Sequence, residues 1–149
     1  MTWQLAQLNI GRILYPTDDP RMADFMDNLD AVNAVADASD GFVWRLQDYG
    51  GNNTGNTDFG DGMIANMSVW RDVPALRAFM ASPEHLPFMK RRHEWFAKLD
   101  MPYMVMWWVP EGHIPTTAEA KDRLDRLTRD GPTREAFGWT GSFAEPDAE

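Results

Sequence analysis

Two strand-like segments, residues 3–10 and 63–70, carry polar side chains that could do chemistry. Strand side chains alternate between two faces, so each segment keeps these residues on one face: Gln7 and Asn9 on the first, and Asn66 and Ser68 on the second. Amide groups can hold a developing enolate or phenolate, which makes Asn9 and Asn66 candidates for oxyanion or carbonyl contacts. The same side chains could instead hydrogen-bond to one another across adjacent strands and set the register.

His85 is the candidate general base among three histidines. An imidazole titrates near physiological pH, so its neutral form could take a proton from an activated carbon held beside the amides. The alternative is a histidine at the rim of the core that donates to a backbone carbonyl. We interpret His93, one stripe over on the same helix, as structural, and His113, beyond the last strand, as a surface or dimer-rim residue.

Further candidates for substrate contacts are large, cationic or sulfur-containing side chains, together with Gln7 and Ser68: Trp44, Arg45, Trp70, Met89, Arg92 and Trp107. The tryptophans could form the walls of a ligand cavity, although packing in a core or interface is their commoner use. Arg45 could pair with an acid across a dimer or lie along the surface. Arg92 could steer a carboxylate or phenolate, or belong to a solvated basic face.

Composition excludes several classes of function. The chain has 149 residues, 44% of them hydrophobic, which suits one domain with a sizeable core. Its net charge of -9 argues against binding to nucleic-acid phosphates. The absence of cysteine excludes disulfides and thiolate sites, and the three histidines show no metal-ligand spacing. No signal peptide and no membrane-spanning run are visible, so we expect a cytoplasmic protein.

The periodicities predict one α+β domain over residues 1–149, with a core at 1–131 that includes an added helix at 117–130, and a tail at 132–149. The predicted elements follow in this order: strand 3–10, a helix from Asp19 to Gly41, strand 42–47, a glycine-rich loop 48–62, strand 63–70, a short helix capped by Asp72, a helix from Ser82 to about Leu99, strand 103–109, and helix 117–130 capped by Thr116. This order is the ferredoxin-like split βαββαβ arrangement with a four-stranded antiparallel sheet.

Such a sheet carries its helices on one face, and we expect the amide-bearing face to be the bare one. A bare face flanked by tryptophans would be unusual for a soluble monomer. Two copies meeting across a two-fold axis would enclose it as a lumen. The sequence therefore predicts a homodimeric α/β barrel with a small-molecule ligand in its lumen and the tail packing on the partner.

The run from Asn66 to His85 resembles the strand-to-helix segment of antibiotic-biosynthesis-monooxygenase-like proteins, in which the strand ends in Trp, the helix opens with an acidic residue, and a Ser-Pro-x-His turn follows. Four further segments are similar to an uncharacterised bacterial branch, a domain of unknown function, of that dimeric α/β-barrel superfamily: residues 5–11, 41–47, 91–96 and 107–113. The resemblance covers residues 4–140. It implies the fold and the homodimer.

The resemblance implies a small-molecule enzyme without a cofactor. Proton abstraction would be followed by oxygenation, or by isomerisation or cyclisation, of a small carbonyl or phenolic substrate. The alternative is a non-catalytic protein that binds a small hydrophobic ligand or haem. Haem-degrading relatives use an axial histidine where an ungapped match places Met89, which counts against haem. A third alternative is a dimer whose lumen is filled by side chains.

Overall fold

The computed structural model describes residues 2–47, 59–60, 62–141 and 143–146, so most of the predicted loop 48–62 lies outside the described residues. The elements are β1 (Trp3–Arg12), η1 (Pro20–Met22), α1 (Ala23–Asp37), β2 (Phe42–Arg45), β3 (Met63–Trp70), α2 (Val73–Met80), α3 (Leu86–Lys90), η3 (Arg92–Glu94), β4 (Met104–Pro110), α4 (Thr117–Asp130) and η4 (Trp139–Gly141). This confirms the predicted α+β class. None of the described helices is long and apolar enough to cross a membrane.

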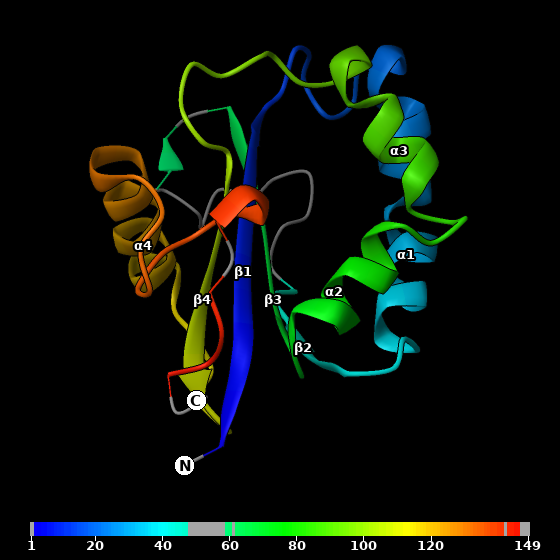
Figure 1. Ribbon diagram of the computed structural model, residues 1–149. Coiled ribbons are helices and arrows are strands. Elements are labelled where there is room, and N and C mark those ends of the chain that lie inside the picture. The colour runs from blue at the N-terminus through cyan, green and yellow to red at the C-terminus, as the bar shows by residue number, and fades with distance from the viewer. Residues whose placement is uncertain (1, 48–58, 61, 142, 147–149) are drawn as a thin grey trace.

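The four strands form one sheet in the order β2-β3-β1-β4, and every neighbouring pair is antiparallel. β1 therefore lies in the middle, between β3 and β4 (Figure 1). Its residues face β3 in a continuous register that sets Gln7 opposite Ser68 and Asn9 opposite Asn66. The four polar residues that the sequence singled out thus form one strip across the two central strands.

Three predicted N-caps begin helices in the structure: Asp19 before η1, Asp72 before α2 and Thr116 before α4. Each side chain accepts a hydrogen bond from a backbone N–H two or three residues further on, at 2.8, 2.9 and 3.1 Å respectively. These bonds satisfy donors that the first helical turn leaves without partners. The capping pattern therefore located the start of each helix correctly.

Helices cover both faces of the sheet, which corrects the expectation of a bare face (Figure 1). The amide-bearing face lies beneath α1, α2 and α3, and its apolar residues pack with Ala36 and Leu76. The opposite face, which includes Leu8, Met67 and Val105, packs against Leu124 and its neighbours on α4. Because these apolar residues are buried within a single chain, a dimer is not needed to cover them. The homodimer stays a prediction.

The helix predicted from Ser82 to about Leu99 is shorter than expected. The structure has only α3 and the 3-10 turn η3 there, and the chain then becomes extended. Phe96 forms an antiparallel bridge with Ile13, with backbone bonds from Leu14 N to Trp95 O and from Ala97 N to Arg12 O, both at 2.9 Å. The pairing with the end of β1 requires extended backbone, and this ends the helix.

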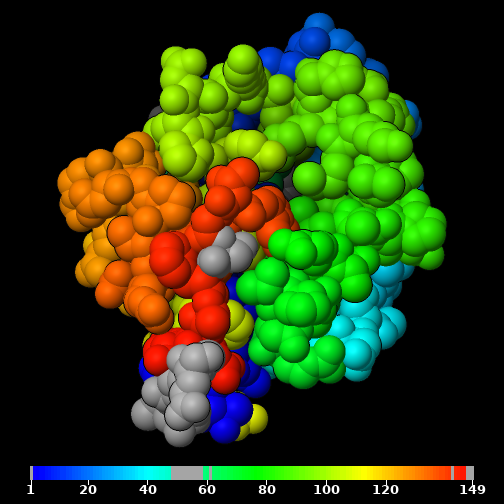
Figure 2. Space-filling model, in the orientation of Figure 1, coloured from blue at the N-terminus to red at the C-terminus, as the bar shows by residue number. Residues whose placement is uncertain are grey.

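The described part of the tail packs on its own subunit. Phe137 is fully buried and exchanges two backbone hydrogen bonds with Met106 on the outer edge of β4. Trp139 and Phe143 pack beside it against the amide-bearing side of the sheet. Figure 2 shows this segment, in red, lying between α2 and α4. It protects an edge strand that would otherwise offer unpaired backbone groups.

We predict that Gly11→Ala destabilises the fold. Gly11 lies at the end of β1, where an added Cβ would come within 2.5 Å of Cδ1 of the buried Phe96 ring. Overpacking of this kind costs about 1–3 kcal/mol of unfolding free energy. Urea denaturation measures the loss. Gly138→Ala, where the added Cβ meets no heavy atom within 4 Å, is the matched control and should be near neutral. Equal stability of the two variants would contradict the prediction.

Candidate functional site

A cavity of about 160 Å³ lies between the amide-bearing face of the sheet and the three helices that cover it. β1 and β3 supply the floor, α1 and the α2–α3 segment supply the roof, and Trp139 from the tail contributes to the wall. Nine of the eleven predicted site residues line this one space: Gln7, Asn9, Arg45, Asn66, Ser68, Trp70, His85, Met89 and Arg92. These residues thus surround a cavity inside one subunit, and a lumen between two protomers stays a prediction.

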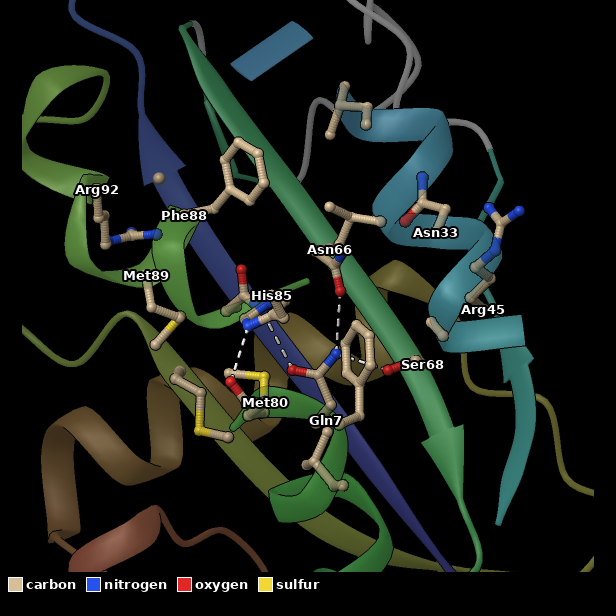
Figure 3. Close-up of a pocket in the computed structure, with 18 of the residues that line it drawn as sticks. Gln7, Asn33, Arg45, Asn66, Ser68, Met80, His85, Phe88, Met89 and Arg92 are labelled. Atoms are coloured by element: carbon tan, nitrogen blue, oxygen red, sulfur yellow. Dashed lines mark hydrogen bonds between the residues drawn. The ribbon is translucent and has the colours of Figure 1, made fainter. Parts of the chain in front are cut away.

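The floor is a connected hydrogen-bond network (Figure 3). Gln7 Nε2 donates to Ser68 Oγ at 2.7 Å and to Asn66 Oδ1 at 3.1 Å, and Asn9 Nδ2 donates to Gln7 Oε1 at 3.3 Å. Ser68 Oγ also accepts from the indole Nε1 of Trp70 at 2.8 Å. The structure confirms the interpretation in which these groups bond to one another across the strands.

The network leaves a donor for a ligand. Asn66 Oδ1 accepts from Gln7, so the other end of the amide, Nδ2, points away from that bond. Among the described residues none accepts a hydrogen bond from Asn66 Nδ2. This nitrogen is not fully buried, so a ligand can contact it. Asn66 lines the cavity, so its N–H groups can reach a carbonyl or oxyanion there.

His85 is positioned by the turn between α2 and α3. Its backbone N–H donates to Ser82 Oγ at 3.2 Å, and its ring lies 4.8 Å from the Phe79 ring, centroid to centroid. Nδ1 is 3.1 Å from the carbonyl oxygen of Met80. A carbonyl can only accept, so Nδ1 carries the proton and the neutral ring keeps its lone pair on Nε2.

Burial sets the charge state of this histidine. Desolvation lowers the pKa of His85 from its ordinary value of 6.5, and the hydrogen bond to the Met80 carbonyl only partly offsets that effect. The ring is therefore neutral at physiological pH. The contact with a backbone carbonyl was the structural alternative for His85 in the sequence analysis. The same contact also fixes the tautomer that a general base needs, with the lone pair on Nε2.

Arg92 follows α3 and reaches back to β1. Its Nη2 donates to the backbone carbonyl of Ile10 at 2.7 Å, and its guanidinium lies 4.3 Å from the ring centroid of Tyr103 and 4.9 Å from that of Phe96. Burial lowers the pKa of Arg92, partly offset by Tyr103. A guanidinium nevertheless remains protonated throughout the physiological range.

Arg45 lies at the other end of the cavity and is neutralised within its own chain. Its Nε donates to Asp37 Oδ1 at 2.7 Å and its Nη2 donates to Asp37 Oδ2 at 3.1 Å. The expected acid across a dimer is therefore a residue of α1 in the same subunit. The guanidinium lowers the pKa of Asp37 through these bonds.

Two predicted wall residues, Trp44 and Trp107, lie on the opposite face of the sheet. A β-bulge between Phe42 and Trp44 turns Trp44 onto that face. With strict alternation, Trp44 would have stayed on the same face as Phe42. Trp107 is fully buried there, and its Nε1 donates to Glu119 Oε2 at 2.8 Å. His113, predicted at the surface, is exposed and bonds to the same carboxylate at 2.7 Å.

Sequence reasoning missed several cavity residues because it placed the helices on the other face. Phe25, Asn33 and Ala36 of α1 line the cavity, as does Tyr103 before β4. The apolar stripe of the first helix was visible in the sequence. The sequence carried no signal that shows which face of the sheet this stripe would cover.

The described charged residues that line the cavity are both arginines. Arg45 and Arg92 line it, and none of the lining residues that the structure describes is an Asp or Glu. Within the described part of the chain there is also no group of three or more His, Cys, Asp or Glu side chains that could hold a metal ion. The described side chains can therefore offer a ligand a neutral base, amide donors and positive charge.

A family model described as "Domain of unknown function (DUF3291)" matches residues 4–149. No curated protein matches the chain. The fold is similar to NE2512, a protein of unknown function from Nitrosomonas europaea, with 15% identity, a TM-score of 0.50, and coverage of 77% of this chain and 97% of that one. Rv0793 from Mycobacterium tuberculosis has 14% identity, a TM-score of 0.51, and coverage of 76% and 99%.

A third solved structure is SnoaB, a cofactor-independent oxygenase from Streptomyces nogalater, with 17% identity, a TM-score of 0.45, and coverage of 74% of this chain and 95% of that one. Likeness at such identities concerns the fold alone. Together with the sheet order, the first two structures confirm the predicted ferredoxin-like architecture.

We predict that Ser68→Ala destabilises the protein by about 1–3 kcal/mol, because it leaves the buried donors of Gln7 and Trp70 without their shared acceptor. Urea denaturation followed by far-UV circular dichroism measures the loss. Ser39→Ala, which removes only a hydroxyl bonded to the Val35 carbonyl at the end of a helix, is the matched control and should change stability by a few tenths of a kcal/mol at most. A neutral Ser68→Ala variant would show that the network does not stabilise the floor.

Proposed function

This chain belongs to the family described as "Domain of unknown function (DUF3291)", and from its cavity we propose that it is a small-molecule enzyme that abstracts a proton without a cofactor. His85 is the general base, and Asn9 and Asn66 contact the carbonyl or phenolic oxygen of the substrate. The observation that carries the proposal is the contact of His85 Nδ1 with the Met80 carbonyl, which assigns the lone pair to Nε2.

The proton transfer requires only the substrate and described side chains. Nε2 of His85 takes a proton from a carbon or hydroxyl of the substrate, and the electron pair of the broken bond moves onto the substrate oxygen. The free N–H of Asn66 then donates to that oxygen as its negative charge develops. Imidazolium and oxyanion form together, so the net charge of the cavity does not change.

Two outcomes are open to the resulting anion. It can pass an electron to dioxygen and combine with the reduced oxygen, which is oxygenation, or it can be reprotonated or attack internally, which is isomerisation or cyclisation. Dioxygen is a co-substrate in the first outcome only. Oxygen consumption by the wild-type protein with an exchanging substrate distinguishes the two.

The size of the cavity limits the substrate. An engineered apolar cavity of about 150 Å³ holds one benzene molecule, and this cavity measures about 160 Å³. Pockets for drug-sized ligands are larger, at about 300–1,000 Å³. A substrate with one ring, or an aliphatic molecule of that size, fits the space. Haem does not fit it without widening of the cavity.

The second candidate is a protein that binds a small hydrophobic molecule without turnover. It is favoured by the apolar roof, where Phe25, Leu29 and Phe88 line the cavity. It is also favoured by the floor, because most hydrogen bonds of the floor amides are made among themselves. Binding with no exchange of substrate protons in any variant would select this candidate, and a Soret band in the purified protein would indicate haem.

We predict that His85→Gln lowers the rate of proton exchange by about 10²–10⁴-fold, the usual contribution of a general base. Deuterium incorporation from D₂O into single-ring ketones, 1,3-diketones and phenols, followed by NMR, measures the rate. His93→Gln is the matched control because His93 is exposed and does not line the cavity. An unchanged rate in His85→Gln with unchanged substrate binding would exclude His85 as the base.

The pH dependence of the same reaction follows from the charge state of His85. A base acts in its deprotonated form, so kcat/KM should rise with pH through the pKa of His85 and then level off. Burial lowers that pKa, so the midpoint of the rise should lie below 6.5. His93→Gln should keep the same profile. A midpoint above 6.5, or a rate that falls as pH rises, would contradict the assignment.

A further inference from the structure

We propose that the substrate is a small monocarboxylate, and that Arg92 binds its carboxylate at one end of the cavity. The turnover of this substrate rests on the proposed function, whereas binding of the carboxylate by Arg92 does not depend on it. The ligand class is a single-ring or similarly sized acid with one carboxylate, whose apolar part occupies the space beneath α1 and α3. Four features of the cavity support the assignment.

The first feature is that Arg92 has no carboxylate partner among the described residues, although the chain carries 23 acidic residues. Six of the ten other arginines are paired with carboxylates at 2.7–3.3 Å: Arg21, Arg45, Arg71, Arg91, Arg126 and Arg129. Within the described part of the chain, the Arg92 side chain makes one hydrogen bond, to the Ile10 carbonyl. A guanidinium has five N–H donors, so most of them remain for a ligand.

The second feature is desolvation. Arg92 is half-buried and packs against the rings of Phe96 and Tyr103, where water cannot fully solvate its charge. A charge held away from water is costly unless it is paired. Guanidinium and carboxylate groups match each other in geometry, and their charge-assisted hydrogen bonds are the stronger kind. A bound carboxylate would supply the pairing that the described side chains do not.

The third feature is the sign of the charges in the cavity. The protein has a net charge of -9, yet the described residues that line the cavity include two arginines and neither an Asp nor a Glu. Arg45 is already paired with Asp37, which leaves the charge of Arg92 to face the ligand. A cation would find no compensating charge from these lining residues, whereas one negative charge would be neutralised.

The fourth feature is the spacing along the roof. His85, Met89 and Arg92 follow at intervals of four and three residues, which places them on one side of a helical segment, and all three line the cavity (Figure 3). His85 precedes α3 and Arg92 begins the 3-10 turn η3, so at about 1.5–2.0 Å of rise per residue the seven-residue interval spans roughly 10–14 Å. A one-ring acid held by Arg92 therefore lies along Met89 and extends its far end toward His85. The anion anchor and the base contact opposite ends of the same small molecule.

Benzoate and benzamide are the probes for this subsite, because they share one shape and differ in charge. Isothermal titration calorimetry of the full chain at low salt should show that benzoate binds at least about tenfold more tightly than benzamide. In ¹H–¹⁵N spectra benzoate should shift the indole N–H of Trp70, on the cavity floor. It should leave that of Trp107, on the opposite face, unchanged.

Arg92→Gln should remove the preference for benzoate, and Arg92→Lys should keep part of it. Lys90→Gln is the matched control, since it removes one positive charge from an exposed position at the end of α3, two residues before Arg92, and should leave the preference intact. The wild-type comparison stands even if Arg92→Gln proves unstable. Equal binding of the two probes, absence of benzoate binding, or a full preference retained in folded Arg92→Gln would each overturn the proposal.

The experiment separates this proposal from the proposed function. Preferential binding of benzoate, together with no His85-dependent proton exchange on any acid tested, would overturn the function and support the subsite. His85-dependent exchange on neutral ketones, with equal binding of benzoate and benzamide, would overturn the subsite and support the function.

Discussion

Buried amides need hydrogen-bond partners, and this requirement governs the central part of the fold. The strip formed by Gln7, Asn9, Asn66 and Ser68 lies under helices, with Gln7 and Ser68 buried and the two asparagines half-buried, so an enclosed polar atom without a partner would cost stability. The strip meets most of the requirement internally, with Ser68 Oγ serving as acceptor for both Gln7 and Trp70. Because those bonds cross between β1 and β3, they also penalise any other strand register.

A polar floor prevents the helices from packing on it as they would on an apolar sheet. Residues such as Phe25 and Phe88 on the roof gain little from contact with amides, and a cavity remains between the layers. The apolar face of the same sheet has no such restriction. α4 packs against it and buries Leu8 and Trp107 completely. One sheet thus supplies a packed core on one face and the floor of a site on the other.

Local features were readable from the sequence, and long-range ones were not. β3 and α4 have the predicted bounds because strand alternation and the Thr116 cap are local signals. Alternation also showed that the two sheet faces differ. It could not show which face the helices would take, because the handedness of the crossover connections, rather than side-chain parity, decides that. Trp44 was misplaced for a related reason, since nothing in the sequence marked the bulge that turns it.

The same burial acts on both basic groups of the roof, with different results. Desolvation disfavours the charged form of any group, and it lowers the pKa of His85 and that of Arg92 alike. An imidazole starts at 6.5, so a downward shift makes it neutral at physiological pH. The ordinary pKa of a guanidinium is so much higher that the group stays charged after its downward shift. One partly desolvated cavity can therefore hold a proton acceptor and a permanent cation on neighbouring turns of the chain, although desolvation lowers the pKa of both groups.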